Sequence, residues 1–151
     1  MDQADGRPRA TAFVPGHITG FFSAHPNTEP ARAGSCGAGV ALSDGVSVTV
    51  SRGSGTRLND EVVEIEPVET VLDRLGVDAR VEAETPLPIG SGFGVSGAVT
   101  LGAALAANAV FGCGMTENEL VEVAHCAEVE AGTGLGDVVA QARGGLPIRL
   151  E

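Results

Sequence analysis

The amino-acid sequence predicts one α+β domain, in which a mostly antiparallel sheet carries its helices on one face. Two observations lead to this fold class. Segments with strand character come first along the chain, and helical segments with interspersed strands follow. A length of 151 residues with 43% apolar residues is enough for a single domain with a buried core.

The first half of the chain predicts strands separated by turns. Pro15 and Gly16 are expected to end the first strand. The turn Ser43-Asp44-Gly45, followed by strict alternation of polar and apolar residues over 46–51, predicts a hairpin. The expected elements are a strand over 10–14, a surface loop through residue 32, a hairpin over 40–51, a polar turn over 52–60 and a strand over 62–66.

The second half predicts helices with clear ends. Apolar residues spaced i, i+3, i+4 and i+7 from Val68, with Pro67 before them and Gly76 after them, predict an amphipathic helix. Thr116 and Glu119 have the spacing of a capping box at the start of another helix. The expected elements are a helix over 68–75, a strand over 77–84, a buried helix over 98–111, a helix over 117–130, a short helix over 137–143 and a strand over 146–150.

The stretch from Leu87 to Thr100 contains four glycines within eight residues and leads into an apolar, alanine-rich run. A glycine-rich turn that opens a helix presents free N–H groups and the positive end of the helix dipole, which suit a phosphate. The spacing Gly92-x-Gly94-x-x-Gly97 also matches the dinucleotide pattern of Rossmann domains. However, Pro86 and Pro88 lengthen the turn and no second strand follows the helix, which disfavours that fold. A flexible connection before a core helix is the alternative interpretation.

The composition excludes several classes of function. The formal net charge is −11, and such an acidic surface repels nucleic acids and anionic membranes. The nine cationic residues are all Arg, and the absence of Lys excludes a Walker A phosphate loop. An acidic, Lys-free globular chain is typical of adaptation to a high-salt cytoplasm. The N-terminus lacks the apolar core of a signal peptide, and we expect a cytoplasmic protein.

The three cysteines, Cys36, Cys113 and Cys126, do not have the spacing of a zinc site. We therefore expect reduced thiols and no zinc.

The glycine-rich stretch resembles the phosphate loop of the GHMP small-molecule kinases, whose pattern is Pro-x-x-x-Gly-Leu-Gly-Ser-Ser-Ala. Gly92, Gly94 and Ser96 match it position by position, whereas Val95 replaces the first Ser and removes its hydroxyl. The resemblance implies the fold of a GHMP kinase N-terminal domain, ATP held by backbone N–H groups, and Mg²⁺ placed by Ser96. The nucleotide-binding residues that it implies are Pro88, Gly90, Ser91, Gly92, Phe93, Gly94, Val95, Ser96, Gly97 and Ala98.

A second match concerns the catalytic carboxylate. Residues 132–137, Gly-Thr-Gly-Leu-Gly-Asp, resemble the family's Gly-x-x-Ser-Gly-x-Asp stretch in an approximate register. The resemblance implies that Asp137 accepts or orients the acceptor's hydroxyl proton, whereas a plain helix N-cap is the alternative. The family also places a Glu upstream as a Mg²⁺ ligand, for which Glu128 is the first candidate and Glu130 the second. An exposed helix face is the alternative for both residues.

A third match concerns the acceptor. Residues 13–22 stand at the place of the family's first motif, Pro-Gly-Arg-x-x-Leu-x-Gly-Glu, but have His17 in place of the Arg and no Glu. Together with the glycine-rich residues 34–39 and with residues 134–141, this version of the motif resembles one archaeal branch of the family, which phosphorylates the 4-hydroxyl of (R)-pantoate on the route to coenzyme A. His17, Thr19 and Ser35 would then face this small-molecule substrate. A loop histidine and two turn hydroxyls are the alternatives.

The resemblance covers roughly residues 10–150. We expect residues 1–9 to be a flexible N-terminus and residues 10–151 to be the ATP-binding N-terminal domain. Members of the family carry a second domain, and the chain looks like the N-terminal half of such a kinase. The expected partner is therefore the missing C-terminal half or a partner chain, with a homodimer as one option. The alternatives are a family kinase acting on shikimate, mevalonate or homoserine, and a non-catalytic half-domain that binds a partner.

Overall fold

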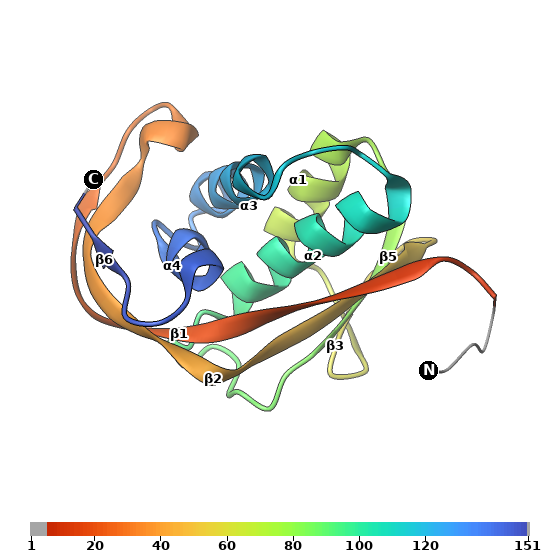
Figure 1. The fold of residues 1–151 in the computed structure, drawn as a ribbon, viewed down its shortest axis with the longest axis horizontal. Helices are drawn as coiled ribbons and strands as arrows, with labels where there is room; N and C mark the ends of the chain where they lie inside the picture. The colour runs from red at the N-terminus through yellow and green to blue at the C-terminus, as the bar shows by residue number, and fades with distance from the viewer. Residues whose placement is uncertain (1–5, 151) are drawn as a thin grey trace.

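A computed structural model describes residues 6–150 of the chain. Figure 1 shows two layers: a long, curved sheet, and a layer of helices that covers one of its faces. The strands are β1 (Arg9–His25), β2 (Gly34–Arg52), β3 (Thr56–Leu58), β4 (Glu61–Val63), β5 (Ala79–Glu84) and β6 (Ile148–Arg149). The helices are α1 (Glu66–Leu75), α2 (Val95–Phe111), α3 (Glu117–Ala131) and α4 (Asp137–Arg143), with a 3-10 turn over Pro30–Arg32. The predicted α+β fold is confirmed.

The sheet is antiparallel apart from one pair of strands. Its order is β1-β2-β5-β3-β4, and β6 pairs with β2 beside this path. β3 runs parallel to β5, and the other pairs are antiparallel. In β5 the apolar residues are buried under the helices and the charged residues between them are exposed, because neighbouring side chains of a strand point to opposite faces.

The helices begin and end close to where the sequence predicts. Pro67 lies in the first turn of α1, and Gly76 ends that helix in the left-handed conformation with φ 68°. The capping box of α3 is present: the Thr116 N–H donates to the Glu119 carboxylate at 2.7 Å, and the Glu119 N–H donates to the Thr116 hydroxyl at 3.4 Å. The sequence patterns at the ends of α1 and α3 therefore predicted these features of the structure correctly.

Strands β1 and β2 are much longer than expected, and the predicted hairpin over 40–51 is wrong. Pro15 pairs with Gly45 and His17 pairs with Ala41, so residues 42–44 of β2 face only Gly16 of β1. The residues Ser43 and Asp44 therefore form a bulge within one strand instead of a turn between two strands. Pairing with β1 gives this segment a long-range partner, which overrides its local turn preference.

Two further expectations in the first half are corrected. The predicted surface loop is shorter, because β1 continues to His25, which pairs with Gly34. The predicted polar turn over 52–60 contains β3, whose Thr56 and Leu58 are buried against β5. Residues 1–5 of the expected flexible N-terminus lie outside the described residues, and Arg9 is already part of β1.

Helix α2 is the centre of the core. It packs on β1 and β2 from one side and contacts α1, α3 and α4 from the other. At Gly102 the helix comes so close to the sheet that a Cβ atom would lie 2.5 Å from Val48 Cγ2. Within residues 6–150, no helix has both the length and the apolar character needed to cross a membrane.

Candidate active site

The glycine-rich loop connects β5 to the N-terminus of α2. Gly90, Gly92 and Gly94 all have positive φ, of 74°, 83° and 70°, which a residue with a Cβ adopts only under strain. Gly94 is the N-cap of α2, and no side chain within residues 6–150 caps this end of the helix. The first backbone N–H groups of α2 are therefore free to bind an anion, and the helix dipole favours one there.

This loop forms one wall of a cavity of about 790 Å³. The cavity lies between the loop and the residues that lead into α1, and Thr19, Thr133 and Asp137 also line it. Of the predicted nucleotide-binding residues, those that line it are Gly90, Gly92, Phe93, Gly94, Val95, Ser96 and Gly97. Their backbone groups and an apolar wall give the mixed lining that is typical of a nucleotide-sized site.

Glu128 is a buried carboxylate held by hydroxyl groups. Its side chain is only 2% exposed. The hydroxyls of Ser96, Thr100 and Thr133 donate to it at 3.0, 2.7 and 2.8 Å. A buried charge needs such partners to offset its loss of hydration. The structure thus brings Ser96 and Glu128, which are 32 residues apart in sequence, into direct contact at the start of α2.

Asp137 opens α4 and lines a second cavity as well as the first. This second cavity has a volume of about 400 Å³, and the two cavities share Thr19, Thr133 and Asp137. Asp137 Oδ1 lies 3.0 Å from His17 Nδ1, and its side chain is 35% exposed. The Asp137 and Glu128 carboxylates flank Gly134: a Cβ there would lie 3.3 Å from Glu128 Oε2 and 4.0 Å from Asp137 Oδ2.

The second cavity contains one cation, Arg149 of β6. Thr19 and Ser35 line the same cavity, and the Arg149 guanidinium donates to the Ser35 hydroxyl at 2.9 Å and to the Gly136 carbonyl. Its Nε is buried and has no hydrogen-bond partner among the described residues. Because Arg149 also lines the cavity, the positive charge of its guanidinium is suited to attract a carboxylate there.

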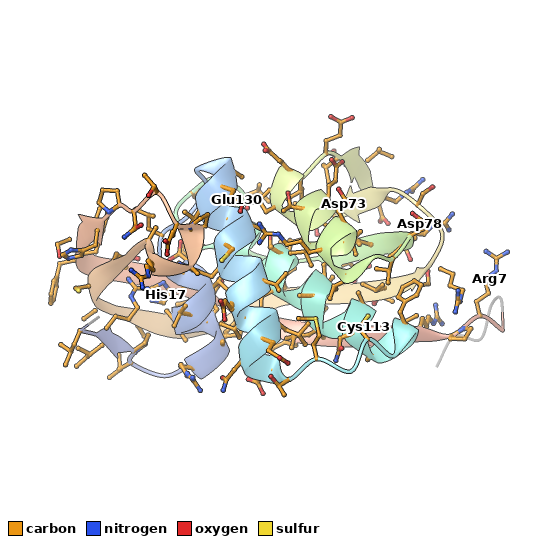
Figure 2. All side chains as sticks on the ribbon, turned by 90° about the horizontal axis from the view of Figure 1, so that it is seen from above. Arg7, His17, Asp73, Asp78, Cys113 and Glu130 are labelled. Carbon is orange, nitrogen blue, oxygen red and sulfur yellow. The ribbon has the colours of Figure 1, made fainter. Side chains whose placement is uncertain are left out.

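Two of the predicted site residues are placed differently. The Glu130 carboxylate forms an ion pair with Arg74 of α1 and does not reach the Ser96–Glu128 contact. His17 is only 1% exposed and lines neither cavity, so its side chain is enclosed by protein next to Asp137. Figure 2 shows the two residues at separate places, with Glu130 at the C-terminal end of α3 and His17 towards the left of the view.

Four residues of this site have no role among the sequence-based predictions: Thr100, Thr133, Gln141 and Arg149. Helical spacing could have found two of them, because Thr100 follows Ser96 by one turn and Gln141 follows Asp137 by one turn. The Gln141 amide donates to the Gly94 carbonyl at 2.7 Å and so connects α4 to the glycine loop. Arg149 could not have been found, because only the pairing of β6 with β2 brings it to the cavity.

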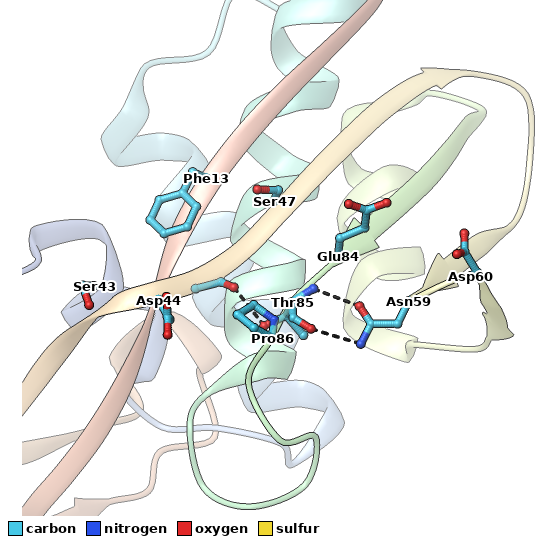
Figure 3. A pocket seen from close by; sticks show the side chains of 10 residues that line it. Phe13, Ser43, Asp44, Ser47, Asn59, Asp60, Glu84, Thr85 and Pro86 are labelled. Carbon is cyan, nitrogen blue, oxygen red and sulfur yellow. Dashed lines mark hydrogen bonds between the residues drawn. The ribbon is translucent and has the colours of Figure 1, made fainter. Parts of the chain in front are cut away.

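Another cavity, of about 540 Å³, lies on a different part of the sheet and shares no residue with the glycine-loop cavity (Figure 3). Its charged lining residues, Asp44, Asp60 and Glu84, are all acidic, so it would repel a phosphate. Asn59 accepts from the Thr85 N–H at 2.9 Å and donates to the Thr85 carbonyl at 3.1 Å (Figure 3). The oxygen and the nitrogen of the Asn59 side chain therefore both have a structural partner.

The residues around Ser96 fit a magnesium ion that is shared with a ligand. Among the residues that the structure describes, no group of three or more His, Cys, Asp or Glu is arranged to hold a metal alone. Mg²⁺ commonly binds one or two carboxylates together with substrate phosphates and water. The oxygen donors of Ser96 and Glu128 beside an anion-binding helix N-terminus meet this description.

Two curated archaeal proteins are similar over most of the chain. The pantoate kinase of Methanospirillum hungatei JF-1 is 38% identical over 152 residues, which cover 93% of this chain and 53% of that protein. The pantoate kinase of Methanocaldococcus jannaschii is 40% identical over 143 residues, which cover 91% of this chain and 52% of that protein. The chain thus spans about half the length of the curated relatives it matches.

A solved structure described as a phosphotransferase related to the CoA biosynthesis pathway has the same fold. It superposes with a TM-score of 0.87 at 36% identity, and the match covers 95% of this chain and 53% of that one. The family of GHMP kinase N-terminal domains matches residues 62–145, which is more than half of the chain. Because this match includes the glycine loop, Glu128 and Asp137, and because the fold agrees with it, the chain belongs to the GHMP kinase family as an N-terminal domain.

Proposed function

We propose that this protein is the catalytic half of an ATP-dependent kinase that phosphorylates the 4-hydroxyl of (R)-pantoate for coenzyme A synthesis. One observation carries the proposal: Asp137 lies where a cavity walled by the glycine loop meets a cavity that contains Arg149. A kinase needs such an arrangement, with the phosphate donor and the acceptor on either side of one carboxylate. The similarity to two archaeal pantoate kinases supports the choice of acceptor.

On the nucleotide side, the backbone of residues 88–98 holds the ATP phosphates. The positive-φ glycines allow the phosphates to approach the main chain, and the N-terminus of α2 contributes free N–H groups. Ser96 and Glu128 would hold Mg²⁺, with Glu128 already oriented by three hydroxyls. When bound, the metal supplies positive charge that neutralises the charge developing on the transferred phosphoryl group.

On the acceptor side, Asp137 accepts the proton of the attacking hydroxyl, or orients that hydroxyl by accepting its hydrogen bond. Arg149 lines this cavity, and its guanidinium binds the acceptor's carboxylate. The hydroxyls of Thr19 and Ser35 line the same cavity and are available to the polar groups of the acceptor. Pantoate carries both features that this lining recognises, a hydroxyl and a carboxylate.

The test is ADP release in the presence of MgATP, with pantoate, shikimate, mevalonate and homoserine offered separately. Because the chain spans half of its relatives, the assay is run on the chain alone and with the remaining half of the Methanospirillum hungatei relative added. We expect pantoate-dependent ADP in at least one of the two formats. ADP with another acceptor would overturn the assignment of pantoate, and failure to bind MgATP in a calorimetric titration would overturn the nucleotide site.

A further inference from the structure

His17 connects the two sides of the candidate active site. Its backbone N–H donates to the Phe93 carbonyl of the glycine loop at 2.9 Å. Its ring nitrogen Nδ1 lies 3.0 Å from Asp137 Oδ1. One residue of β1 is therefore bound by its main chain to the glycine loop and by its side chain to Asp137, which follows it by 120 positions in the sequence.

The ring of His17 is enclosed by protein. The side chain is 1% exposed, and a Cβ atom at Gly39 of β2 would lie 2.4 Å from Nε2 and 2.8 Å from Cε1. Nε2 is buried without a hydrogen-bond partner among the described residues, whereas Nδ1 has the Asp137 carboxylate. The arrangement that best satisfies the ring places the hydrogen on Nδ1, where it donates to Asp137, and leaves Nε2 without one.

We propose that His17 is a positioning residue, which fixes the Asp137 carboxylate relative to the glycine loop and does not contact the acceptor. Its Nδ1–H occupies Asp137 Oδ1, so that Oδ2 remains on the side of Gly134 and Glu128. The choice of the reacting oxygen is thereby set before any ligand binds. This inference rests on the proposed role of Asp137 and assigns the histidine a task different from acceptor binding.

Two substitutions of similar size separate this role from a structural one. In His17→Asn the amide nitrogen can take the place of Nδ1, whereas in His17→Gln it extends towards the place of Nε2. We expect His17→Gln to lower kcat about 100-fold, since a carboxylate displaced by about 1 Å loses that much. We expect His17→Asn to recover at least about one tenth of the wild-type kcat, and the KM for MgATP to stay within about threefold in both variants.

Two outcomes of this comparison overturn the proposal. Equal kcat in the two variants means that the Nδ1 position has no special role. An effect confined to the KM of the acceptor means that His17 binds the acceptor directly. Thermal unfolding of each variant accompanies the kinetics, because both substitutions alter a buried position.

A spectroscopic test is independent of turnover. Long-range ¹H–¹⁵N spectra of the wild-type chain distinguish the two tautomers of its three histidines, and His25→Gln identifies an exposed one. We expect His17 to show the Nδ1–H tautomer and to lose that preference in Asp137→Ala. An Nε2–H tautomer, or a His17 signal unchanged by Asp137→Ala, overturns the proposal. Absence of kinase activity with the expected tautomer present counts against the proposed function instead.

Discussion

Two carboxylates in the candidate active site have different surroundings, and this difference separates their tasks. Glu128 is buried and accepts hydrogen bonds from three hydroxyls, so its position is fixed and its charge is compensated. Asp137 is 35% exposed, has one oxygen bound to His17 and lines both cavities. The first residue suits a metal ligand, and the second suits a group that receives a proton.

Asp137→Ala tests the proposed role of Asp137 as the group that receives the proton. We expect kcat with pantoate to fall about 10³-fold, in the range typical of a lost general base, while the Kd of MgATP changes less than about threefold. A coupled assay of ADP release and a calorimetric titration measure the two quantities. The matched control is Glu130→Ala, which removes an acidic residue that is ion-paired to Arg74 away from the site. Equal loss of kcat and of MgATP affinity, with the fold preserved, would show that Asp137 does not act at the transfer step.

Glu128→Gln tests the proposed role of Glu128 as a metal ligand, since it keeps the shape of the side chain and removes its charge. We expect the Mg²⁺ concentration needed for half-maximal ATP binding to rise about 10-fold or more, because a ligand carboxylate is lost. Titration of ATP binding at a series of Mg²⁺ concentrations measures this. Glu130→Gln is the control, and an unchanged Mg²⁺ requirement in Glu128→Gln would rule out the metal-binding role.

At the scale of elements, the site depends on how the glycine loop meets helices α2 and α4. The loop ends at Gly94, whose carbonyl accepts the amide of Gln141, and whose positive φ turns the chain into α2. A Cβ at Gly97 would lie 2.9 Å from Gln141 Oε1 and 3.6 Å from Asp137 Cβ, so α4 packs closely on the first turn of α2. Small residues at these positions let Asp137 approach the glycine loop.

Gly94→Val is expected to weaken MgATP binding about 10-fold or more. The new side chain is strained at φ 70°, and its Cβ would lie 2.7 Å from Gln141 Nε2, which displaces the loop. Gly112→Val is the matched control: it has φ 62° at the other end of α2, and a Cβ there would have no atom within 4 Å. Both variants should lose stability, but only Gly94→Val should lose nucleotide affinity; similar affinities in the two would refute the assignment of the phosphate loop.

The capping box of α3 predicts a pH dependence of stability. Hydrogen bonds from the Thr116 backbone N–H and hydroxyl lower the pKa of Glu119 below its usual value. A lowered folded-state pKa stabilises the fold above the unfolded-state pKa, and this contribution is lost as the pH falls through the lowered value. We therefore expect the Tm of the wild type to exceed that of Glu119→Gln near neutral pH and the difference to vanish in acid. Thermal unfolding between about pH 7 and about pH 3 measures it, and a constant difference would contradict the capping role of the charge.

At the scale of the whole molecule, the net charge of −11 opposes the compact state through self-repulsion. Salt shortens the range of that repulsion from about 10 Å at 0.1 M to about 3 Å at 1 M. We expect the Tm to rise by about 3 °C or more over this change in KCl, which corresponds to about 1 kcal/mol for a chain of this size. NaCl should give the same rise if screening is the cause, and a Tm that is independent of salt would argue against the high-salt adaptation.

Local interactions explain why many features could be predicted from the sequence. The ends of α1 and α3, the alternation of β5 and the buried helix α2 depend on residues within a few positions of one another. The resemblance of the glycine loop and of Asp137 to the family's motifs likewise uses contiguous residues. The contact between Ser96 and Glu128 was anticipated only through that resemblance, because 32 residues separate them.

The sequence by itself determined the fold class, most helix ends and the family of this protein, since each is encoded in short patterns of residues. The tertiary structure alone decided the length of β1 and β2, the burial of His17, the ion pair of Glu130 and the arrival of Arg149 at the second cavity. Each of these depends on pairing between segments that are distant along the chain. Such pairing is set by how the layers pack, and local preferences such as the turn at Ser43-Asp44-Gly45 yield to it.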